Sequence, residues 1–582
     1  MGKWQSMHEK SFEKYFQNEL GKLQDLAKEF SSEHPAVAPL LNAHNADPDA
    51  QRLLEGVAFL TALLNQKLDN EFPEVIHALM NILFPHYLKP IPALSIVEFT
   101  PKPSLREIIK IPKGTIIKST PIDDVACSFS TTSDLNMYPM KLNTIEYTAN
   151  EQSRLVLNLE VVNNNIASLN VEALDFYLND TYNEAANLFM LLSHYLEKIT
   201  VEFDDKKISL NKDSLKCKGF DRKNALFHYQ KNTLSSYMIL QEYFLLPQTF
   251  FFFQLENLTQ LKNYPNIVNF KIAFDFKTSP IFLSSPSNET IKLFCTPLSN
   301  LFKEEAEPIT ITHYKEFLQV RPPLRYSDTY QVYDVDKVSG YIQGEVKQKE
   351  YFPFESFEKD ELDKNIYQVH RKISIVTGKE ELYLSLHYND KDEIKKETLS
   401  INISCTNGKL PERLQLGEIS KGSDNSPELA TFKNIIPCTI QIESPINENS
   451  LWQFISHLSI NLLTLADLKT FKEMLTLYIF ENNRDKSRVA KNKKRIDAIE
   501  DFEVYPIDMV SRGYLLKGHK VVMGIRQDYF ASLGDLYLFC SVILQFLGSY
   551  ASLNTFVELE VKEKITGESF TWIPILGSKK LI

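Results

Sequence analysis

The residue types that most often perform chemistry are dispersed along this chain. Its six cysteines occur singly, at positions 127, 217, 295, 405, 438 and 540, without any C-x-x-C pair. This spacing matches neither a common zinc site nor a thioredoxin-like site, and it is typical of a protein from a reducing compartment. Of the 12 histidines, His86 follows Pro85 and His457 lies in an apolar helical stretch. Both positions favour a structural histidine over a metal ligand.

No short motif supplies a catalytic constellation. The chain contains no H-E-x-x-H, G-x-S-x-G or G-x-G-x-x-G sequence. Gly513 to His519 has histidine where a phosphate-binding loop needs lysine, and Asn389 to Glu393 lacks the glycine of a calcium loop. Because catalysis needs convergent polar groups, we expect no catalytic residue, no cofactor and no metal. A soluble enzyme, a hydrolase or transferase without a recognisable motif, is the alternative.

The charge balance bears on the class of partner. A net charge of −11 over 582 residues argues against a nucleic-acid-binding protein, which needs a basic face. One run, Lys486 to Arg495 (KSRVAKNKKR), is strongly basic. A nucleic-acid tail is one interpretation, but a mobile solvated loop is favoured in so acidic a chain.

One stretch must be tested as a membrane span. Leu536 to Val557 has no charged residue and is long enough to cross a bilayer as a helix. Its second half is interrupted by polar residues such as Gln545, and its apolar positions follow one helix face. We therefore expect a buried core helix from Phe530 to Tyr550, with Asp528 as its N-cap, and no direct membrane insertion. The N-terminus shows no apolar segment of a secretory signal.

The first elements that could position a site lie between Asp47 and Pro92. Asp47 is suited to cap a helix, and apolar residues recur at three- and four-residue steps from Leu53 to Leu68. Pro73 is expected to start a second helix, which ends at Pro85. Together these features predict a rigid helical hairpin that packs against another element or another subunit.

After Pro92 the alternation of apolar residues predicts mainly strands, including a buried strand at Phe250 to Phe253. The chain is too long for one core. We expect a multidomain α+β fold in which an N-terminal α-helical hairpin or bundle is followed by β-rich domains and a C-terminal α/β region. The expected domains are residues 1–92 (helical), 93–308 (α+β), 309–445 (β-rich) and 446–582 (α+β).

Several separated motifs give a further signal. They are DPDAQRLLEG from Asp47, KLDNEFP from Lys67, FPHYLKPIP from Phe84, LQEYF from Leu240, FCTPLSNLFKEEAEP from Phe294, CTNGKLPERL from Cys405 and LWQFISHLSIN from Leu451. In sequence and in order they resemble the TssF family, the baseplate subunit of bacterial type VI secretion systems. Agreement in order across nearly the whole chain is more specific than any single motif.

The resemblance implies a structural baseplate wedge component with no enzymatic activity. Its implied partners are TssG, a second copy of itself, TssE, TssK, the spike hub (VgrG) and the base of the sheath, without nucleic acid. It also implies a cytoplasmic bacterial protein that is assembled at the inner face of the inner membrane. The matching motifs nominate structural or interface residues: Asp47, Arg52, Leu53, Glu55, Leu68, Asp69, Phe72, Pro73, Tyr87, Glu242, Tyr243, Phe244, Trp452, His457 and Asn461.

Overall fold

The computed structural model describes most of residues 84–577 and a few earlier positions. The earlier positions are 20, 48, 52, 53, 55–61 and 80; the gaps after residue 84 are 85, 150–152, 205, 228, 230–234, 265–266, 278–283, 285, 312–315, 343–347, 355–364, 375–378, 388–396, 446–466, 481–483, 512, 552–554 and 578–582. The chain divides into two compact units, Met1–Leu83 with Leu451–Ile455, and Phe84–Ser450 with Ser456–Ile582. All sheets described below belong to the second unit.

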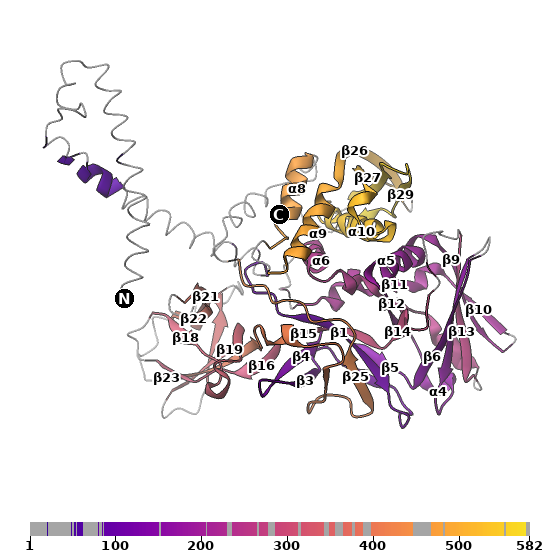
Figure 1. Cartoon of the computed structure of the whole chain (residues 1–582), viewed down its shortest axis with the longest axis horizontal. Helices are drawn as coiled ribbons and strands as arrows, with labels where there is room; N and C mark the ends of the chain where they lie inside the picture. The colour runs from indigo at the N-terminus through magenta and orange to yellow at the C-terminus, as the bar shows by residue number, and fades with distance from the viewer. Residues whose placement is uncertain are drawn as a thin grey trace, which may run out of the picture. The chain divides into compact units, whose positions relative to one another are not determined.

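A six-stranded sheet joins parts of the chain that are far apart in sequence (Figure 1). Its order is β24 (Ile419–Lys421), β3 (Ile116–Ile122), β4 (Val125–Thr131), β15 (Cys295–Ser299), β1 (Leu94–Pro101) and β25 (Ala430–Asn434). β1 pairs antiparallel with both neighbours, so Ile96 lies opposite Pro297 and Phe99 lies opposite Phe432. Ile96 and Phe99 are both buried, as expected for a strand inside a sheet that is covered on its faces.

The segment between residues 109 and 293 also forms two smaller sheets and a two-stranded ribbon. The five-stranded sheet has the order β10 (Lys206–Leu210), β9 (Leu196–Phe203), β13 (Asn269–Phe276), β7 (Arg154–Val161) and β6 (Met140–Thr148). The four-stranded sheet has the order β11 (Leu215–Cys217), β12 (Phe252–Leu255), β8 (Leu174–Leu178) and β14 (Ile291–Leu293), and β2 (Ile109–Ile111) pairs with β5 (Leu135–Met137). Along β7, buried and half-buried residues alternate strictly, which is the period-two pattern of a strand with one covered face.

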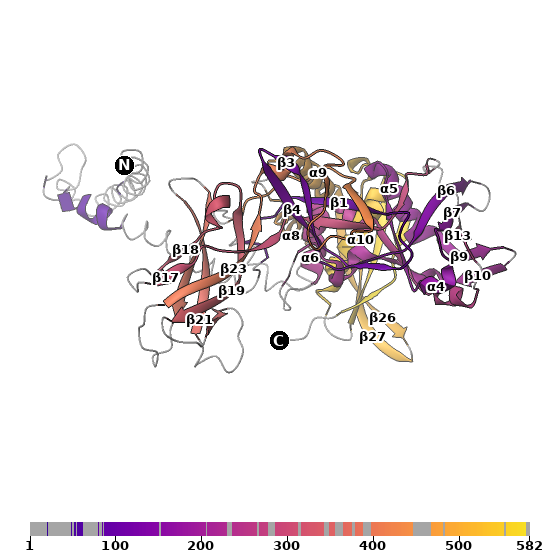
Figure 2. The same ribbon diagram turned by 90° about the horizontal axis from the view of Figure 1, so that it is seen from below.

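Figure 2 shows the strands of an eight-stranded sheet. This sheet has its own hydrophobic core. Its order is β16 (Phe302–Glu305), β23 (Glu397–Thr406), β19 (Gln331–Ile342), β20 (Lys349–Pro353), β21 (Asn365–Ile373), β22 (Glu380–His387) and β18 (Leu318–Val320), with β17 (Ile309–Ile311) also paired to β23. Val338, Leu384, Leu399, Ile401 and Ile403 are fully buried in that core. The long strands β19 and β23 therefore form the centre of a separately packed layer.

The C-terminal part combines helices with a sheet. α8 (Leu468–Thr476) and α9 (Lys486–Asp497) precede the hairpin of β26 (Ile499–Ser511) and β27 (Tyr514–Ile525). β27 then pairs in parallel with β28 (Thr555–Glu563), and the crossover between them is α10 (Leu533–Gly548); β29 (Ser569–Thr571) and β30 (Ile575–Leu576) complete the sheet. A parallel pair needs such a crossover helix.

α10 also packs against two other helices (Figure 1). It packs against α5 (Tyr182–Met190), which continues into the π-helical turn η1 (Leu191–Tyr195), and against α6 (Ser235–Leu245). α4 (Ile166–Leu169) is a single short turn elsewhere. A Cβ on Gly534 would lie 2.2 Å from the carbonyl oxygen of Ala186, so the backbones of α10 and α5 can approach this closely because residue 534 is glycine.

The predicted fold class is wrong. Strands in six sheets dominate the described chain, and the described residues before position 84 do not form a helical bundle. The prediction overweighted one helical periodicity, which is local information, and underweighted many strands of three to nine residues, whose short patterns carry little signal singly. The predicted hairpin from Asp47 to Pro92 falls mostly outside the described residues.

Two local predictions also need correction. Residues 486–495 are not a mobile loop: they form most of α9, and the side chain of Asp485 accepts a hydrogen bond from the backbone N–H of Arg488 as its N-cap. The helix predicted from Phe530 begins at Leu533, and its N-cap is Ser532, not Asp528. The expected burial of this helix is confirmed, since 15 of its 16 residues are buried. Within the described chain, no helix is both long and apolar enough to cross a membrane.

The proposed division into four domains stays a prediction. One observation bears on the position at residue 308: β24 and β25, from the predicted 309–445 region, complete a sheet whose other strands come from residues 94–299. The two regions are therefore joined by continuous hydrogen bonding as well as by the chain.

Candidate functional site

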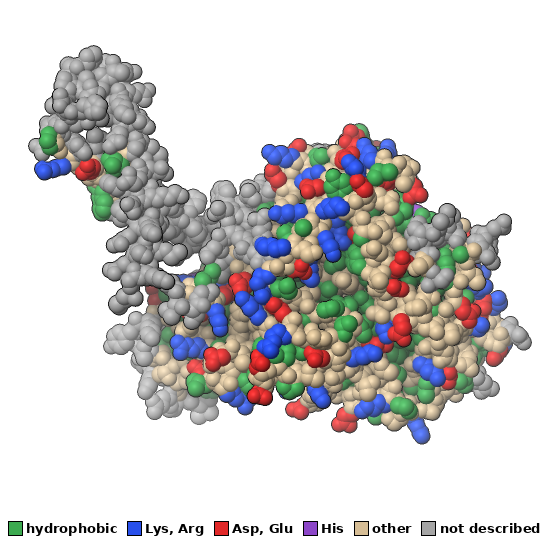
Figure 3. Space-filling model, in the orientation of Figure 1, with side chains coloured by type: hydrophobic (Ala, Val, Ile, Leu, Met, Phe, Trp, Pro, Cys, Tyr) green, Lys and Arg blue, Asp and Glu red, His purple; other side chains and the backbone are tan. Residues whose placement is uncertain are grey.

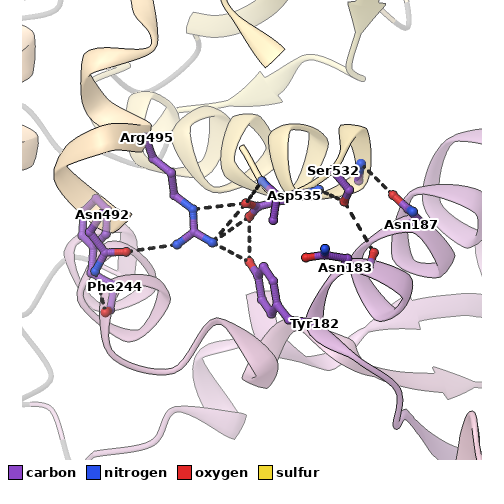
Figure 4. Close-up of polar contacts among 10 residues, drawn as sticks. Tyr182, Asn183, Asn187, Phe244, Asn492, Arg495, Ser532 and Asp535 are labelled. Atoms are coloured by element: carbon purple, nitrogen blue, oxygen red, sulfur yellow. Dashed lines mark hydrogen bonds and ion pairs between the residues drawn. The ribbon is translucent and has the colours of Figure 1, made fainter. Parts of the chain in front are cut away.

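Helices α5, α6, α9 and α10 meet around one buried ion pair (Figure 4). Arg495 of α9 and Asp535 of α10 are 7% and 1% exposed, and Nη2 of Arg495 lies 2.9 Å from Oδ1 of Asp535. The hydroxyl of Tyr182, at the start of α5, donates to the same Oδ1 at 2.7 Å. The carboxylate is thus bound from both α9 and α5, and each contact orients a different helix.

Polar neighbours extend this junction to α6 and to the start of α10 (Figure 4). Asn492 donates through Nδ2 to the carbonyl oxygen of Phe244 at 3.0 Å and accepts from Nη1 of Arg495 at 3.0 Å. The backbone N–H of Gly534 donates to Oδ1 of Asn187 at 3.2 Å. A buried ion pair is stable only when its remaining donors and acceptors are satisfied, and these contacts meet that condition. We name Tyr182, Asn187, Asn492, Arg495 and Asp535 the four-helix junction.

The electrostatics of the junction favour a fixed charge state. Burial disfavours the charged form of Arg495, but Tyr243, Tyr182 and Asp535 outweigh this effect and raise its pKa. Burial, followed by the charge of Asp535, raises the pKa of the Tyr182 hydroxyl well above its usual value. The arginine stays charged and the tyrosine stays neutral across the physiological range. The groups bind one another, so the arrangement holds helices together and presents no nucleophile or proton donor to a substrate.

A second, half-buried junction ties the segment before β1 to the eight-stranded sheet. Lys89 forms an ion pair with Asp334 of β19, and Arg371 of β21 pairs with Glu380 of β22 while its Nη2 lies 3.8 Å from Oδ1 of Asp334. Burial disfavours both charges of the first pair, but their mutual attraction raises the pKa of Lys89 and lowers that of Asp334. The segment before β1 and three strands are therefore joined by one charge network.

The C-T-N motif that begins at Cys405 connects the eight-stranded sheet to the six-stranded sheet. Asn407 is 2% exposed, and its Oδ1 accepts from the backbone N–H of Ser128 and from Nδ2 of Asn300, both at 2.9 Å. Its own N–H donates to Oδ1 of Asn300 at 2.8 Å. These bonds link the end of β23 to β4 of the six-stranded sheet.

Four of the nominated residues lie in the interior of the larger unit. Tyr87 is 1% exposed and its hydroxyl donates to the carbonyl oxygen of Leu477 at 2.8 Å. Glu242, Tyr243 and Phe244 are buried in α6, where the guanidinium of Arg495 lies 5.4 Å from the ring of Tyr243. Glu242 accepts from the N–H of Leu226 at 2.9 Å, and burial raises its pKa to about 8.

The other nominated residues divide into two groups. Arg52, Leu53 and Glu55 belong to the smaller unit and are exposed; Leu53 is 72% exposed. Eight fall outside the described residues, namely Asp47, Leu68, Asp69, Phe72, Pro73, Trp452, His457 and Asn461.

His86 lies beside a small cavity that is also lined by Lys89, Phe227, Tyr229 and Tyr333. Neither ring nitrogen has a hydrogen-bond partner among the described residues, and burial, aided by the charge of Lys89, lowers its pKa to about 3. The ring is therefore neutral and packs against aromatic neighbours. Within the described chain, no group of three His, Cys, Asp or Glu side chains could hold a metal ion.

Sequence reasoning missed Arg495 and Asp535. A signal was present, because Asp485 is a suitable N-cap and Val489, Asn492 and Ile496 follow it at helical spacing. The high density of lysine concealed this pattern. Asp535 carried no comparable signal, since its partner is 40 residues away and on another helix.

Comparison with known proteins agrees with the motifs. A family model described as "Type VI secretion system, TssF" matches residues 8–579. The TssF1 component of the type VI secretion system of Pseudomonas aeruginosa is 25% identical over 625 residues, covering 97% of this chain and 98% of that protein. The chain therefore belongs to the TssF family, whose members are components of the type VI secretion baseplate.

Two solved assemblies contain similar chains. A chain of the TssK–TssF–TssG baseplate subcomplex, determined by cryo-electron microscopy, superposes with a TM-score of 0.74 at 25% identity, covering 90% of this chain and 98% of that one. A chain of a type VI secretion baseplate complex gives a TM-score of 0.61 at 23% identity over 98% and 100% of the two chains, which shows a shared fold.

Proposed function

We propose that this chain is a structural wedge subunit of a type VI secretion baseplate and assembles with TssG and TssK. The observation that carries the proposal is the likeness, over 90% of the chain, to a protein held in a TssK–TssF–TssG subcomplex. The two junctions support a scaffold, because their charged and polar groups bind one another. In this role the chain acts through its shape and performs no catalysis.

The further partners belong to the same proposal. A second copy of the chain, TssE, the spike hub (VgrG) and the base of the sheath would contact it within the assembled wedge. The site of action would be the bacterial cytoplasm, at the inner face of the inner membrane, where a baseplate can dock.

The smaller unit offers candidate contact residues. Leu53, Val57 and Leu60 are 72%, 48% and 62% exposed, although all three are apolar. Clustered exposed apolar residues commonly mark interaction sites. We assign this segment, with Arg52 and Glu55, to a contact with a neighbouring subunit.

The mechanism would be mechanical. Close-packed interiors transmit displacement because they shift between discrete arrangements and do not deform continuously. Two groups of contacts connect the sheets and helices of the larger unit rigidly. They are the four-helix junction and the Lys89–Asp334–Arg371 network. A rigidly connected unit can hold neighbouring subunits at fixed positions until the baseplate rearranges.

Co-expression tests the proposal. The chain should be poorly soluble or self-associated when it is produced alone, and it should form a monodisperse complex when TssG and TssK are produced with it. Size-exclusion chromatography with light scattering measures both states. A stable monomer that neither TssG nor TssK retains would contradict the proposal.

A further inference from the structure

The exposed side of α9 carries a concentrated positive charge in an acidic protein. From Asp485 to Asp497 the chain has six basic and two acidic residues, against a net charge of −11 for the whole protein. Asn492, Arg495 and Ile496 are the buried residues of this helix. The lysines at 486, 491, 493 and 494 occupy the opposite side, and we name them the α9 basic face.

Contacts of the two arginines fix the helix to its neighbours. Asp485 caps the helix and pairs with Arg488, whose Nη1 also donates to the carbonyl oxygen of Leu245 at 2.7 Å. Lys494 approaches the backbone carbonyl of Asp528 at 3.4 Å, and Lys491 has no ion pair with any described residue. Arg488 and Arg495 thus anchor the helix to its neighbours, and Lys491 remains exposed.

The positive surface continues onto the adjoining helix. Lys472 of α8 donates to the carbonyl oxygen of Asp497, at the C-terminal end of α9, at 3.2 Å. Lys469 of α8 is also exposed. Figure 3 shows Lys and Arg side chains gathered over α8 and α9. The surface is therefore broader than one helix.

We propose that the α9 basic face docks an acidic segment of another baseplate subunit. This inference rests on the proposed function and specifies the chemistry of one contact within it. Charge complementarity favours an acidic partner, and charges at the rim of an interface govern encounter rate and specificity. The rigid attachment of α9 through Arg495 would hold the lysines in register with carboxylates on that partner.

Two other anionic partners fit the surface less well. A helix that binds a lipid surface needs large exposed apolar residues beside its lysines. Here Ile496 is buried, Val489 is half-buried, and the exposed positions between lysines are Ser487 and Ala490. A nucleic acid needs a continuous basic field, whereas the exposed residues Glu500 and Asp501 follow α9 directly in β26. The acidic protein segment is therefore the favoured occupant.

Carboxyl-to-amine cross-linking of the co-purified complex with TssG and TssK tests this assignment. A zero-length carbodiimide reagent joins a lysine amine to a carboxylate in direct contact, so mass spectrometry should find Lys491 or Lys494 joined to Asp or Glu of a different polypeptide. Acetylation of these lysines should be roughly tenfold slower in the complex than in the free chain, whereas exposed Lys212 and Lys223 should react equally in both.

Charge reversal supplies a matched test. Lys491→Glu with Lys494→Glu should weaken assembly roughly tenfold at low salt, with less effect at high salt because exposed charges are screened. Lys212→Glu with Lys223→Glu changes the net charge equally and should leave assembly unchanged. Equal assembly by both pairs, cross-links confined to this chain, or protection that nuclease or detergent abolishes would overturn the inference. Absence of the wild-type chain from the complex would instead overturn the proposed function.

Discussion

Arg495 and Asp535 face each other across 2.9 Å, from two helices whose paired residues are 40 positions apart in sequence. Both are withdrawn from solvent, and Tyr182 closes the pair from a third helix. The stability of the C-terminal helices therefore depends on a contact that no single helix contains.

Removal of one partner should destabilise this region strongly. Asp535→Ala leaves the guanidinium of Arg495 buried without its carboxylate, and breaking a buried pair in this way costs about 3–5 kcal/mol. Hydrogen exchange of α9 and α10, followed by mass spectrometry, measures the loss. Replacing both groups, with Arg495→Met and Asp535→Leu, should recover part of it.

The exposed pair of Arg526 and Asp528 is the control for this prediction. Its atoms lie 2.7 Å apart, but the side chains are 40% and 45% exposed. Exposed pairs contribute about 0–1 kcal/mol, so Asp528→Ala should change exchange little. An effect of Asp535→Ala no larger than this would show that the buried pair does not hold the helices.

Gly534→Ala should disrupt the crossing of α10 and α5. The new Cβ would lie 2.2 Å from the carbonyl oxygen of Ala186, which is backbone and cannot turn aside. Overpacking of this kind costs about 1–3 kcal/mol or more. Gly548→Ala in the same helix is the control, because its Cβ would meet the Cγ2 methyl of the half-buried Ile575 at 2.9 Å and no backbone atom. The midpoint temperature of thermal unfolding should drop clearly for Gly534→Ala and little for Gly548→Ala.

Glu242 should make the protein less stable as the pH rises. Burial raises its folded pKa to about 8, whereas its ordinary value is 4.5. Between these values the folded state retains a proton that the unfolded state has released, so the free energy of unfolding falls as the pH increases. Glu242→Gln, which mimics the protonated form, should match the wild type near pH 4.5 and exceed its stability above pH 8.

Unfolding midpoints of both proteins from pH 5 to 9 measure this difference. The exposed Glu428 offers a control variant, Glu428→Gln, whose midpoint should follow that of the wild type. A constant offset between Glu242→Gln and the wild type at every pH would mean that Glu242 keeps the same charge state in the folded and unfolded chains.

His86 should make the protein less stable as the pH falls, which is the opposite of the effect of Glu242. Burial and Lys89 lower its folded pKa to about 3, so between pH 6.5 and 3 the unfolded state binds a proton that the folded state does not. This group therefore removes stability as the pH falls through that range. His86→Phe, which keeps a ring beside Phe84 and Tyr229, should unfold less readily than the wild type near pH 4.

The exposed His387 provides the comparison for that variant. His387→Phe should not change the pH dependence of the unfolding midpoint. If His86→Phe and the wild type lose stability in parallel between pH 6.5 and 4, the buried ring does not cause the dependence.

The sequence alone could predict features that repeat within one element. The alternation that predicts strands after Pro92 is clear in residues 382–387 and 399–405, which the structure places in β22 and β23. Phe250 to Phe253 are all buried as predicted, although the first two belong to the turn η5 (Pro247–Phe251) and the last two to β12. Alternation and burial are encoded locally, so a single sequence reveals them.

The sequence alone could not predict which distant residues pair. Lys89 and Asp334 are separated by 245 positions, and nothing in either neighbourhood indicates the other. The same holds for Asn300 and Asn407. Nδ2 of Asn300 donates to Oδ1 of Asn407, and the backbone N–H of Asn407 donates to Oδ1 of Asn300. Such contacts follow from the topology, and a sequence without related sequences contains no record of which strands pair.

β1 can complete its hydrogen bonding only after translation has produced β25. Thr100 pairs with Thr431, 331 residues later, while the other edge of β1 waits for Cys295–Ser299. A nascent chain therefore carries an open strand edge, a known site of misassociation, through much of its synthesis. The length of that interval is set by the speed of the ribosome and not by the strength of any contact in the finished fold.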